Sequence, residues 1–151
     1  MNKTKNIKCK RIVGGITKGK LLFSEQPLNF LAMLNVKTGQ VIDINHELIN
    51  KTLKNNILVF PNSVGSSVGA YTIFSLKNNN TSPNGIICTN SVDITTASGC
   101  AISNIPLVYI DKTNFEELKN YLDKKDKNSN GIILDAEKEI ITLFFDNDKS
   151  I

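Results

Sequence analysis

The sequence predicts an α/β fold in which a parallel sheet with helices carries an attached layer of β-strands. Three short runs, at residues 57–60, 85–89 and 107–110, are almost wholly apolar, which is typical of strands buried on both faces. Helix-like segments separate these runs, and such alternation requires right-handed crossovers within one parallel sheet. Residues before 57 are instead rich in strand and turn signals, which predicts the β layer.

Length and composition favour a single domain over residues 1–151. A chain of 151 residues with 40% hydrophobic and 21% charged residues can bury a core but is too short for two ordinary domains. No apolar run approaches the roughly 18 residues of a membrane-spanning helix, and residues 1–11 lack the apolar segment of a secretory signal. We therefore expect a cytoplasmic protein without membrane contact. The lysines near the start of the chain also lead us to expect that residues 1–7 form a flexible basic arm.

Charge and cysteine usage argue against two classes of function. The net charge is +4, but Arg11 is the only arginine and no stripe of basic and aromatic residues is present, so we expect no nucleic-acid partner. The three cysteines, Cys9, Cys88 and Cys100, include no Cys-x-x-Cys pair, and their odd number favours reduced thiols. We expect no metal or cluster to be bound by this chain alone.

Strand and turn signals dominate the first half of the chain. Strands are expected at residues 7–13, 20–24 and 41–44, with turn residues between them. An irregular apolar stretch after Pro27 contains Phe30, Leu31, Met33 and Leu34. These four side chains either fill the β layer or face another protein, and we expect the former.

Helical signals separate the buried strands of the second half. Helices are expected at about residues 67–77 and 96–103, and the amphipathic pattern of residues 115–122 follows a capping-box spacing at Thr113 and Glu116. A charged turn at residues 124–131 leads to two strands, 131–134 and 139–145, which we expect to pair as a closing hairpin.

The loop that follows the buried strand 57–60 is the most informative segment for function. It contains Ser63, Gly65, Ser66, Ser67 and Gly69 and runs directly into the expected helix. Ligands of α/β proteins gather at the carboxyl ends of such strands, and the two glycines let a ligand or another backbone approach closely. The unpaired N–H groups and the dipole of a helix start favour an anion and would also stabilise a serine alkoxide, so a serine here could act as a base. A simple helix cap is the alternative that the local residues favour.

Other candidate catalytic side chains stand alone in the sequence. His46 is the only histidine, and its setting between Asn45 and Glu47 favours a polar turn residue over a catalytic partner of serine. Single acidic residues without a paired-carboxylate signature lie near expected strand ends at Asp43, Glu47, Asp93 and Asp111. A complete catalytic constellation is therefore not expected within this chain.

An ordered set of short motifs resembles the swivel-domain subunit of the aconitase X family. The motifs are Gly14-Gly15-x-x-x-Gly19, the segments 21–30 (LLFSEQPLNF) and 38–43 (TGQVID), His46-x-Leu48, the segment 57–61 (ILVFP), Gly65-Ser66-Ser67-x-Gly69 and the segment 105–108 (IPLV). They cover residues 8–110, most of the chain, and their order is more specific than any one of them. The resemblance implies a swivelling β/β/α domain.

The resemblance also implies an activity that two subunits share as a heterodimer. In the family, a large subunit holds a 4Fe-4S cluster on its own cysteines, and the cluster acts as a Lewis acid on the substrate hydroxyl. A serine of the small subunit accepts the proton, and water leaves. The serine of the family's Gly-Ser-[Ser/Thr] motif corresponds to Ser66, the expected proton acceptor, with Ser67 as the less favoured choice. Ser63, Gly65 and Gly69 are the expected substrate-binding positions.

A free-standing subunit of this length implies a particular substrate within the family. The implied reaction is the dehydration of (R)-5-phosphomevalonate to trans-anhydromevalonate 5-phosphate in the archaeal mevalonate pathway. Fused relatives act on hydroxyproline-type substrates, which leaves another small hydroxy acid as an alternative. A second alternative is a non-catalytic binding or regulatory module, such as a phosphohistidine carrier that would use His46.

Two departures from the family pattern bear on the site. Val64 stands where members often have lysine or arginine, and residues 32–35 (AMLN) replace a common Gly-Gly-Val-Asp segment. The missing basic residue weakens the case for phosphate or carboxylate binding by this loop, unless Lys18 or Lys20 supplies the charge from elsewhere.

Overall fold

The computed structural model of the protein describes residues 3–124 and 131–146. In chain order the elements are β1 (Lys3–Lys8), β2 (Lys10–Val13), β3 (Ile16–Gly19), β4 (Leu21–Phe23), α1 (Phe30–Met33), β5 (Ile57–Phe60), α2 (Gly69–Asn78), β6 (Gly85–Cys88), α3 (Ile94–Ser103), β7 (Leu107–Tyr109), α4 (Lys112–Leu122), β8 (Ile132–Asp135) and β9 (Ile140–Phe145). Most of the turn expected at residues 124–131 lies outside the described residues. In those two described ranges, no helix has the length and apolar character needed to cross a membrane.

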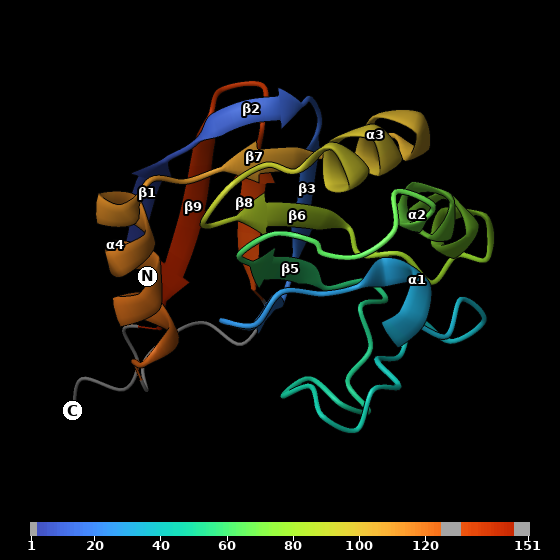
Figure 1. Ribbon diagram of the computed structural model, residues 1–151. Coiled ribbons are helices and arrows are strands. Elements are labelled where there is room, and N and C mark those ends of the chain that lie inside the picture. The colour runs from blue at the N-terminus through green and yellow to red at the C-terminus, as the bar shows by residue number, and fades with distance from the viewer. Residues whose placement is uncertain (1–2, 125–130, 147–151) are drawn as a thin grey trace.

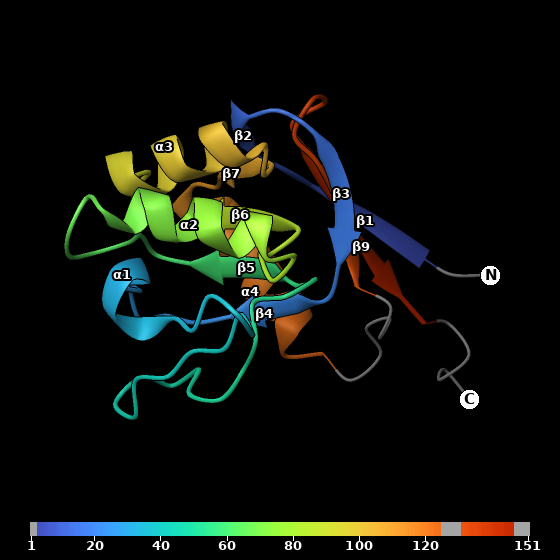
Figure 2. The same ribbon diagram turned by 90° about the vertical axis from the view of Figure 1, so that its right-hand side faces the viewer.

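Two sheets form the frame of the fold (Figure 1). The five-stranded sheet has the order β2-β7-β6-β5-β4, in which β4 to β7 run parallel and β2 pairs antiparallel with β7 at one edge. The four-stranded sheet has the order β1-β9-β8-β3, and all of its pairs are antiparallel. Helices α1, α2 and α3 cover one face of the five-stranded sheet, whereas the four-stranded sheet and α4 cover the other (Figures 1 and 2). This arrangement confirms the expected β/β/α fold with a parallel sheet and an attached β layer.

Alternate residues of the central strands separate two hydrophobic clusters. On the helical face, Leu58 and Phe60 of β5 pack with residues such as Ile73 of α2. On the opposite face, Ile57 and Val59 pack with the four-stranded sheet and α4. All four residues of β5 are fully buried, as the continuous apolar run predicts for a strand covered on both sides.

The N-terminal segment is a strand, so the expectation of a flexible arm at residues 1–7 is wrong for residues 3–7. Residues Lys3–Lys8 form β1, which pairs with β9 over six residues, and the side chain of Ile7 is buried. The other side chains of β1 are exposed, which explains the basic composition. The local sequence did not reveal this strand because its hydrogen-bond partners come from the other end of the chain.

The strand expected at residues 7–13 is divided between the two sheets. Cys9 separates β1, which pairs with β9, from β2, which pairs with β7. The first half of the chain also does not form the β layer alone, because β8 and β9 supply its two central strands. The segment Leu21–Phe23 instead joins the parallel sheet as β4. Pairing between distant segments therefore decides which sheet each strand enters.

The strand expected at residues 41–44 is reduced to isolated bridges. The N–H of Ile42 donates a hydrogen bond to the carbonyl of Met33 at 2.8 Å. Asp43 then starts a turn, in which its carboxylate accepts a hydrogen bond from the N–H of Asn45 at 2.8 Å. This local bond ends the extended segment before a strand can form.

The apolar residues 30–34 divide between the core and the surface. Phe30 and Leu34 are buried, and the ring of Phe30 meets that of Phe60 edge-on with the centroids 5.8 Å apart. The two residues fill the core beneath the helices and not, as expected, the β layer. Leu31 is 49% exposed because the helical geometry of α1 places it on the opposite side.

Aspartate side chains cap α3 and α4 ahead of the expected starts of these helices. α3 follows Asp93, which lies before the expected start at residue 96. α4 follows Asp111, whose carboxylate accepts a hydrogen bond from the N–H of Asn114 at 2.8 Å, so Thr113 is not the cap. Aspartate is the stronger N-cap of the two residue types, which accounts for the choice.

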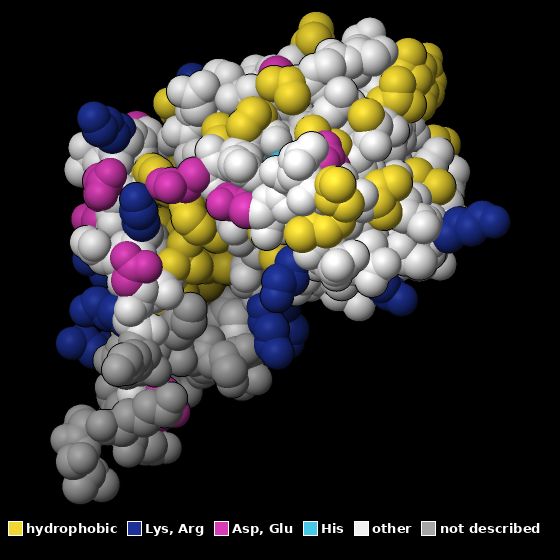
Figure 3. Space-filling view, turned by 60° about the horizontal axis from the view of Figure 1, so that its bottom comes forward, with side chains coloured by type: hydrophobic (Ala, Val, Ile, Leu, Met, Phe, Trp, Pro, Cys, Tyr) yellow, Lys and Arg dark blue, Asp and Glu magenta, His cyan; other side chains and the backbone are white. Residues whose placement is uncertain are grey.

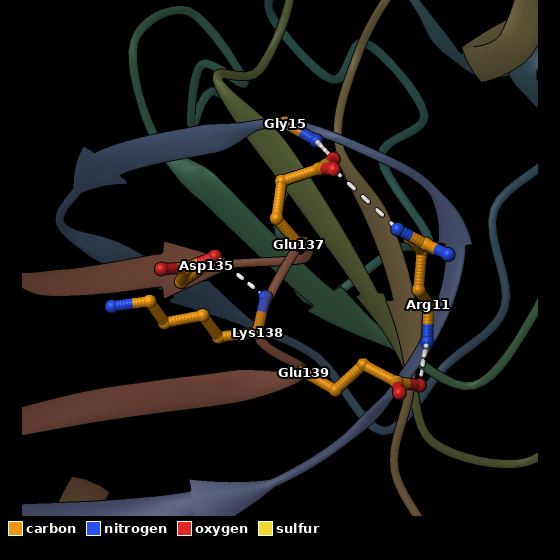
Figure 4. Close-up of polar contacts among 6 residues, drawn as sticks. All are labelled: Arg11, Gly15, Asp135, Glu137, Lys138 and Glu139. Atoms are coloured by element: carbon orange, nitrogen blue, oxygen red, sulfur yellow. Dashed lines mark hydrogen bonds and ion pairs between the residues drawn. The ribbon is translucent and has the colours of Figure 1, made fainter.

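The expected closing hairpin is confirmed, and its turn is fastened to the start of the chain (Figure 4). Glu139 accepts a hydrogen bond from the N–H of Arg11 at 2.8 Å, and Glu137 accepts one from the N–H of Gly15 at 2.6 Å. The guanidinium of Arg11 also pairs with Glu137 at 3.4 Å, but both side chains are exposed. Such pairs stabilise a protein by only about 0–1 kcal/mol, so the backbone contacts are the stronger connection.

Candidate active site

The loop between β5 and α2 lies where three parallel strands end. Residues 61–68 follow the last residue of β5, while the neighbouring strands β4 and β6 lead into α1 and α3. Figure 2 shows α1 and the starts of α2 and α3 gathered at this end of the sheet, on the left. The carboxyl ends of parallel strands are the usual place for ligands in α/β proteins, so this loop is the candidate site.

Ser66 occupies the start of the turn that becomes α2. Its Oγ accepts a hydrogen bond from the N–H of Val68 at 3.1 Å, and its carbonyl oxygen accepts one from the N–H of Gly69 at 3.0 Å. α2 itself begins at Gly69, two residues after the expected start. The Ser66 hydroxyl therefore caps the turn and also lies in the positive potential of a helix start. The capping and functional interpretations are compatible in this geometry.

Three consecutive backbone N–H groups of this loop have no hydrogen-bond partner in the described parts of the chain. The N–H groups of Gly65, Ser66 and Ser67 make no hydrogen bond to any residue in 3–124 or 131–146. Both serines are exposed. Free N–H groups at a helix start are suited to hold an anionic oxygen atom.

Gly65 is required for its backbone conformation and for its lack of a side chain. Its φ of +89° lies in the region that favours glycine. An added Cβ would collide with the side-chain amide of Asn29, whose Oδ1 accepts a hydrogen bond from the N–H of Ala32 at 3.1 Å and caps α1. Asn29 therefore packs directly on the loop beside Ser66.

Gly69 serves a close contact between protein elements. It is buried, and an added Cβ would lie 3.1 Å from Cγ2 of Thr95 and 3.3 Å from Cβ of Phe30. These distances are tight for carbon atoms, so the glycine lets the start of α2 lie between α1 and α3. The sequence suggested that a ligand or another backbone approaches Gly69 closely. In the structure, the close contacts of Gly69 are with Thr95 of α3 and Phe30 of α1.

Ser63 is buried and held by Asp93. The hydroxyl of Ser63 donates a hydrogen bond to Oδ2 of Asp93, and the N–H of Ser63 donates one to Oδ1 at 2.8 Å. Of the five residues that the sequence nominated, Gly65, Ser66 and Ser67 thus lie together at the surface, while Ser63 and Gly69 contact neighbouring elements.

Sequence reasoning missed Asn29 and Asp93 as residues of the site. Asp93 had one available signal, because it stands three residues before Thr96 in a capping spacing. The contacts of Asp93 with Ser63 and of Asn29 with Gly65 join residues about 30 positions apart or more, and no local pattern reveals them.

His46 is a buried structural residue. It is 5% exposed, its Nδ1 accepts a hydrogen bond from the N–H of Leu48 at 3.0 Å, and its Nε2 lies 3.1 Å from the carbonyl of Pro27. Because Nδ1 is the acceptor, Nε2 carries the proton and donates to Pro27. With both ring nitrogens engaged, His46 does not fit the phosphohistidine carrier of the second alternative, and it is more buried than a polar turn residue.

The neighbouring Glu47 fastens the segment after β4. Its carboxylate accepts hydrogen bonds from the hydroxyl of Ser24 and from the N–H of Glu25, the latter at 2.9 Å. The hydrogen bond from Ser24 is the main reason that the pKa of Glu47 lies below its usual value. Segments 24–28 and 46–48, which both belong to the motif set, therefore act as one structural unit.

The cysteines of this chain do not fit a shared metal or cluster site. Cys88 and Cys100 lie in the cluster on the helical face of the sheet, whereas Cys9 packs against the opposite cluster. Burial raises the pKa of Cys9 and Cys88 to about 12 and also raises that of Cys100, so all three favour the neutral thiol. Metals bind the thiolate. Over residues 3–124 and 131–146, no group of three or more His, Cys, Asp or Glu side chains is placed to hold a metal ion.

Lys18 and Lys20 lie away from the candidate site. The carbonyl of Lys20 accepts a hydrogen bond from the N–H of Ile57 at 2.8 Å, at the amino end of β5, and Lys18 lies in β3 of the other sheet. Ser66 follows the carboxyl end of β5. The suggestion that either lysine replaces the basic residue missing at Val64 is therefore wrong.

Comparisons with known proteins agree with this fold and motif order. Residues 6–141 match the family model of the aconitase X swivel domain. The chain is 43% identical over 118 residues to the phosphomevalonate dehydratase small subunit of Methanococcoides burtonii, covering 78% of this chain and 85% of that protein. It is 34% identical over 138 residues to the protein of the same name from Methanothrix thermoacetophila, covering 91% and 93%. A chain in the crystal structure of Thermococcus kodakaraensis aconitase X, in its holo-form, matches with a TM-score of 0.75 and 31% identity over 92% of this chain and 98% of that one. The chain therefore belongs to the aconitase X swivel-domain family.

Proposed function

We propose that this chain is the small subunit of a heterodimeric hydro-lyase that dehydrates (R)-5-phosphomevalonate to trans-anhydromevalonate 5-phosphate in the archaeal mevalonate pathway. The observation that carries the proposal is the exposed Ser66 hydroxyl at the start of α2, on the loop that bears the family's serine motif. The names of the archaeal relatives support the reaction and the substrate. The proposal places the enzyme in the cytoplasm, where its three free cysteines would stay reduced.

In this proposal Ser66 accepts the proton that the substrate loses. A serine hydroxyl is a weak base until its deprotonated form is stabilised, and here the N–H of Val68 and the dipole of α2 supply a fixed positive potential. The free N–H groups of Gly65 and Ser67 are available to an anionic oxygen of the substrate. Ser67 remains the second choice for the base, because no backbone N–H donates to its hydroxyl within residues 3–124 and 131–146.

The site needs a second polypeptide to be complete. Ser66 is exposed in this chain, and electrostatic stabilisation of an alkoxide is strongest where water is excluded. The aconitase X family implies an iron–sulfur enzyme with a large subunit, and the cysteines of this chain do not fit a cluster. We therefore propose that the large subunit holds the 4Fe-4S cluster and closes over Ser66.

Exposed apolar side chains surround Ser66 and are the proposed contact with the large subunit. The apolar rim consists of Leu31, Val64, Val68 and Ile94, all of which are exposed. The packing of Gly69 against Thr95 and Phe30 brings the three elements of this rim together. At the right of Figure 3, on the side that carries α1 to α3, hydrophobic side chains lie among mostly white atoms with a few lysines at the edge, whereas most carboxylates in view lie toward α4. Exposed apolar patches that surround an incomplete site are typical of protein–protein contacts.

Polar substitutions in the apolar rim are expected to weaken the heterodimer. Leu31→Gln and Ile94→Gln should each raise the dissociation constant about tenfold or more, because burying one such side chain contributes about 1.5–3 kcal/mol. Titration calorimetry with purified large subunit measures the change. Ile102→Gln is the matched control, since Ile102 is 59% exposed near the other end of α3. Equal affinities for all three variants would contradict the proposed contact surface.

The proposed reaction is tested with both purified subunits. The large subunit, reconstituted with its cluster under anaerobic conditions, is expected to dehydrate 5-phosphomevalonate only when this chain is present. Mevalonate and a hydroxyproline serve as competing substrates in the same assay. Turnover of hydroxyproline alone would support the related dehydratase, and an assembled but inactive pair would support a non-catalytic module. Either result would contradict the proposal.

A further inference from the structure

Asp93 makes more hydrogen bonds than a helix cap requires. Its carboxylate accepts hydrogen bonds from four donor groups, two backbone N–H groups and two hydroxyls. On one side, the N–H and hydroxyl of Thr96 lie 2.9 Å from Oδ2 and Oδ1, which caps α3. On the other side, the N–H of Ser63 lies 2.8 Å from Oδ1, and the Ser63 hydroxyl donates to Oδ2.

The environment keeps this carboxylate charged. Asp93 is half-buried, and burial raises its pKa, but the hydrogen bonds from Ser63 and Thr96 outweigh burial and hold the pKa below its usual value. A charged acceptor forms hydrogen bonds that are shorter and stronger than those of a neutral one. Asp93 therefore connects the start of α3 to the loop after β5 through strong hydrogen bonds.

The same loop is attached on its opposite side to the segment after β4. Leu28 pairs with Ser63 in a parallel bridge, and the N–H of Val64 donates a hydrogen bond to the carbonyl of Leu28 at 2.9 Å. Ser63 thus lies between Leu28 and Asp93, three residues before Ser66. Gly65, between Val64 and Ser66, has a φ of +89°, and the side chain of Asn29 lies where a Cβ at this position would be.

We propose that Asp93 is a positioning residue of the dehydratase, which holds Ser63 and thereby fixes the place of the Ser66 hydroxyl. This inference rests on the proposed function of Ser66. It also gives the Ser63 hydroxyl a role in anchoring the loop, whereas the sequence suggested substrate binding. Displacing a catalytic group by about 1 Å can cost about 100-fold in rate, so a small shift of this loop matters.

Asp111 provides a matched control within the same chain. It caps α4 in the way that Asp93 caps α3, and its carboxylate accepts a hydrogen bond from the N–H of Asn114. α4 packs against the four-stranded sheet on the other face of the molecule. Asp111→Asn therefore reports the cost of weakening an aspartate cap without touching the loop.

The experiment compares Asp93→Asn, Ser63→Ala, the double variant and Asp111→Asn in the assembled enzyme with saturating large subunit. An amide nitrogen cannot accept a hydrogen bond, so Asp93→Asn loses part of both attachments. We expect kcat to fall about tenfold or more with KM unchanged within about twofold, and Asp111→Asn to leave both constants near those of the wild type. Ser63→Ala keeps the helix cap and should lower kcat in the same direction. The double variant should be no slower than Asp93→Asn, because both residues act through one connection.

Amide hydrogen exchange of the isolated chain is a second measurement, and it tests whether Asp93 holds the loop without depending on turnover. Amides of residues 63–68 should exchange faster in Asp93→Asn than in Asp111→Asn. Unchanged kcat and unchanged exchange in Asp93→Asn would overturn the inference. A raised KM at constant kcat in Ser63→Ala would also overturn it, in favour of substrate binding by Ser63. If the wild-type pair is inactive, the proposed function fails, and the exchange rates still decide whether Asp93 holds the loop.

Discussion

Replacing Ser66 by alanine is expected to lower kcat of the assembled enzyme by at least about 100-fold, because general-base catalysis typically contributes about 100- to 10,000-fold. The hydroxyl is the group that would hold the proton, and it accepts a hydrogen bond from the N–H of Val68 on the exposed loop. The variant also loses the hydrogen bond to the N–H of Val68 in the turn that leads into α2, and losing such a capping contact costs about 0.5–2 kcal/mol of stability. Steady-state kinetics at saturating large subunit, with the melting temperature recorded alongside, separate these two effects.

Ser67→Ala is the matched control for this prediction. Ser67 is equally exposed and adjacent, but its hydroxyl makes no hydrogen bond to the described parts of the chain, residues 3–124 and 131–146. Its replacement should leave kcat within about threefold of the wild type, as expected for a group outside the proton transfer. Full activity of Ser66→Ala together with loss of activity in Ser67→Ala would transfer the role of the base to Ser67.

Replacing Phe60 by alanine is expected to destabilise the protein by about 3–5 kcal/mol, the usual cost of removing a large buried aromatic side chain. Phe60 is fully buried at the end of β5 and packs edge-on against Phe30 of α1. The cavity would open in the cluster between the sheet and the helices, at the last residue of β5 before the loop 61–68. Denaturant unfolding of the isolated chain measures the loss of free energy.

Phe74→Ala provides the comparison for this second prediction. Phe74 lies in α2, near the same helices, but it is 38% exposed. Its replacement should cost well below half as much as that of Phe60, because its ring already contacts water in the folded chain. Similar losses for both variants would show that the ring of Phe60 does not support the core in the way described.

Local sequence was sufficient for the central elements of the fold. The run Ile57–Phe60 identifies a strand covered on both faces, because only full burial tolerates four consecutive apolar side chains. The loop of small residues after it locates the candidate site, since the same glycines and serines that end a strand also begin a helix there. Motif order added the expectation that Ser66 is the proton acceptor, whereas the local residues alone favoured a helix cap.

The supports of the site were beyond local reasoning. Asp93 and Asn29 contact Ser63 and Gly65 across about 30 or more positions of sequence, and neither contact leaves a periodic pattern. His46 similarly has the neighbours of a turn residue, and only the tertiary structure shows that it is buried and contacts the carbonyl of Pro27.

By itself, the sequence determined which segments are buried strands and where the candidate loop lies, because these features follow from the composition of adjacent residues. Only the tertiary structure decided that residues 3–8 are a strand, that residues 10–13 join the other sheet, and that Asp93 holds the loop. Each of these depends on hydrogen bonds to a partner far along the chain. Such partners are chosen by the packing of the two sheets, and the periodicity of a single segment carries no record of that choice.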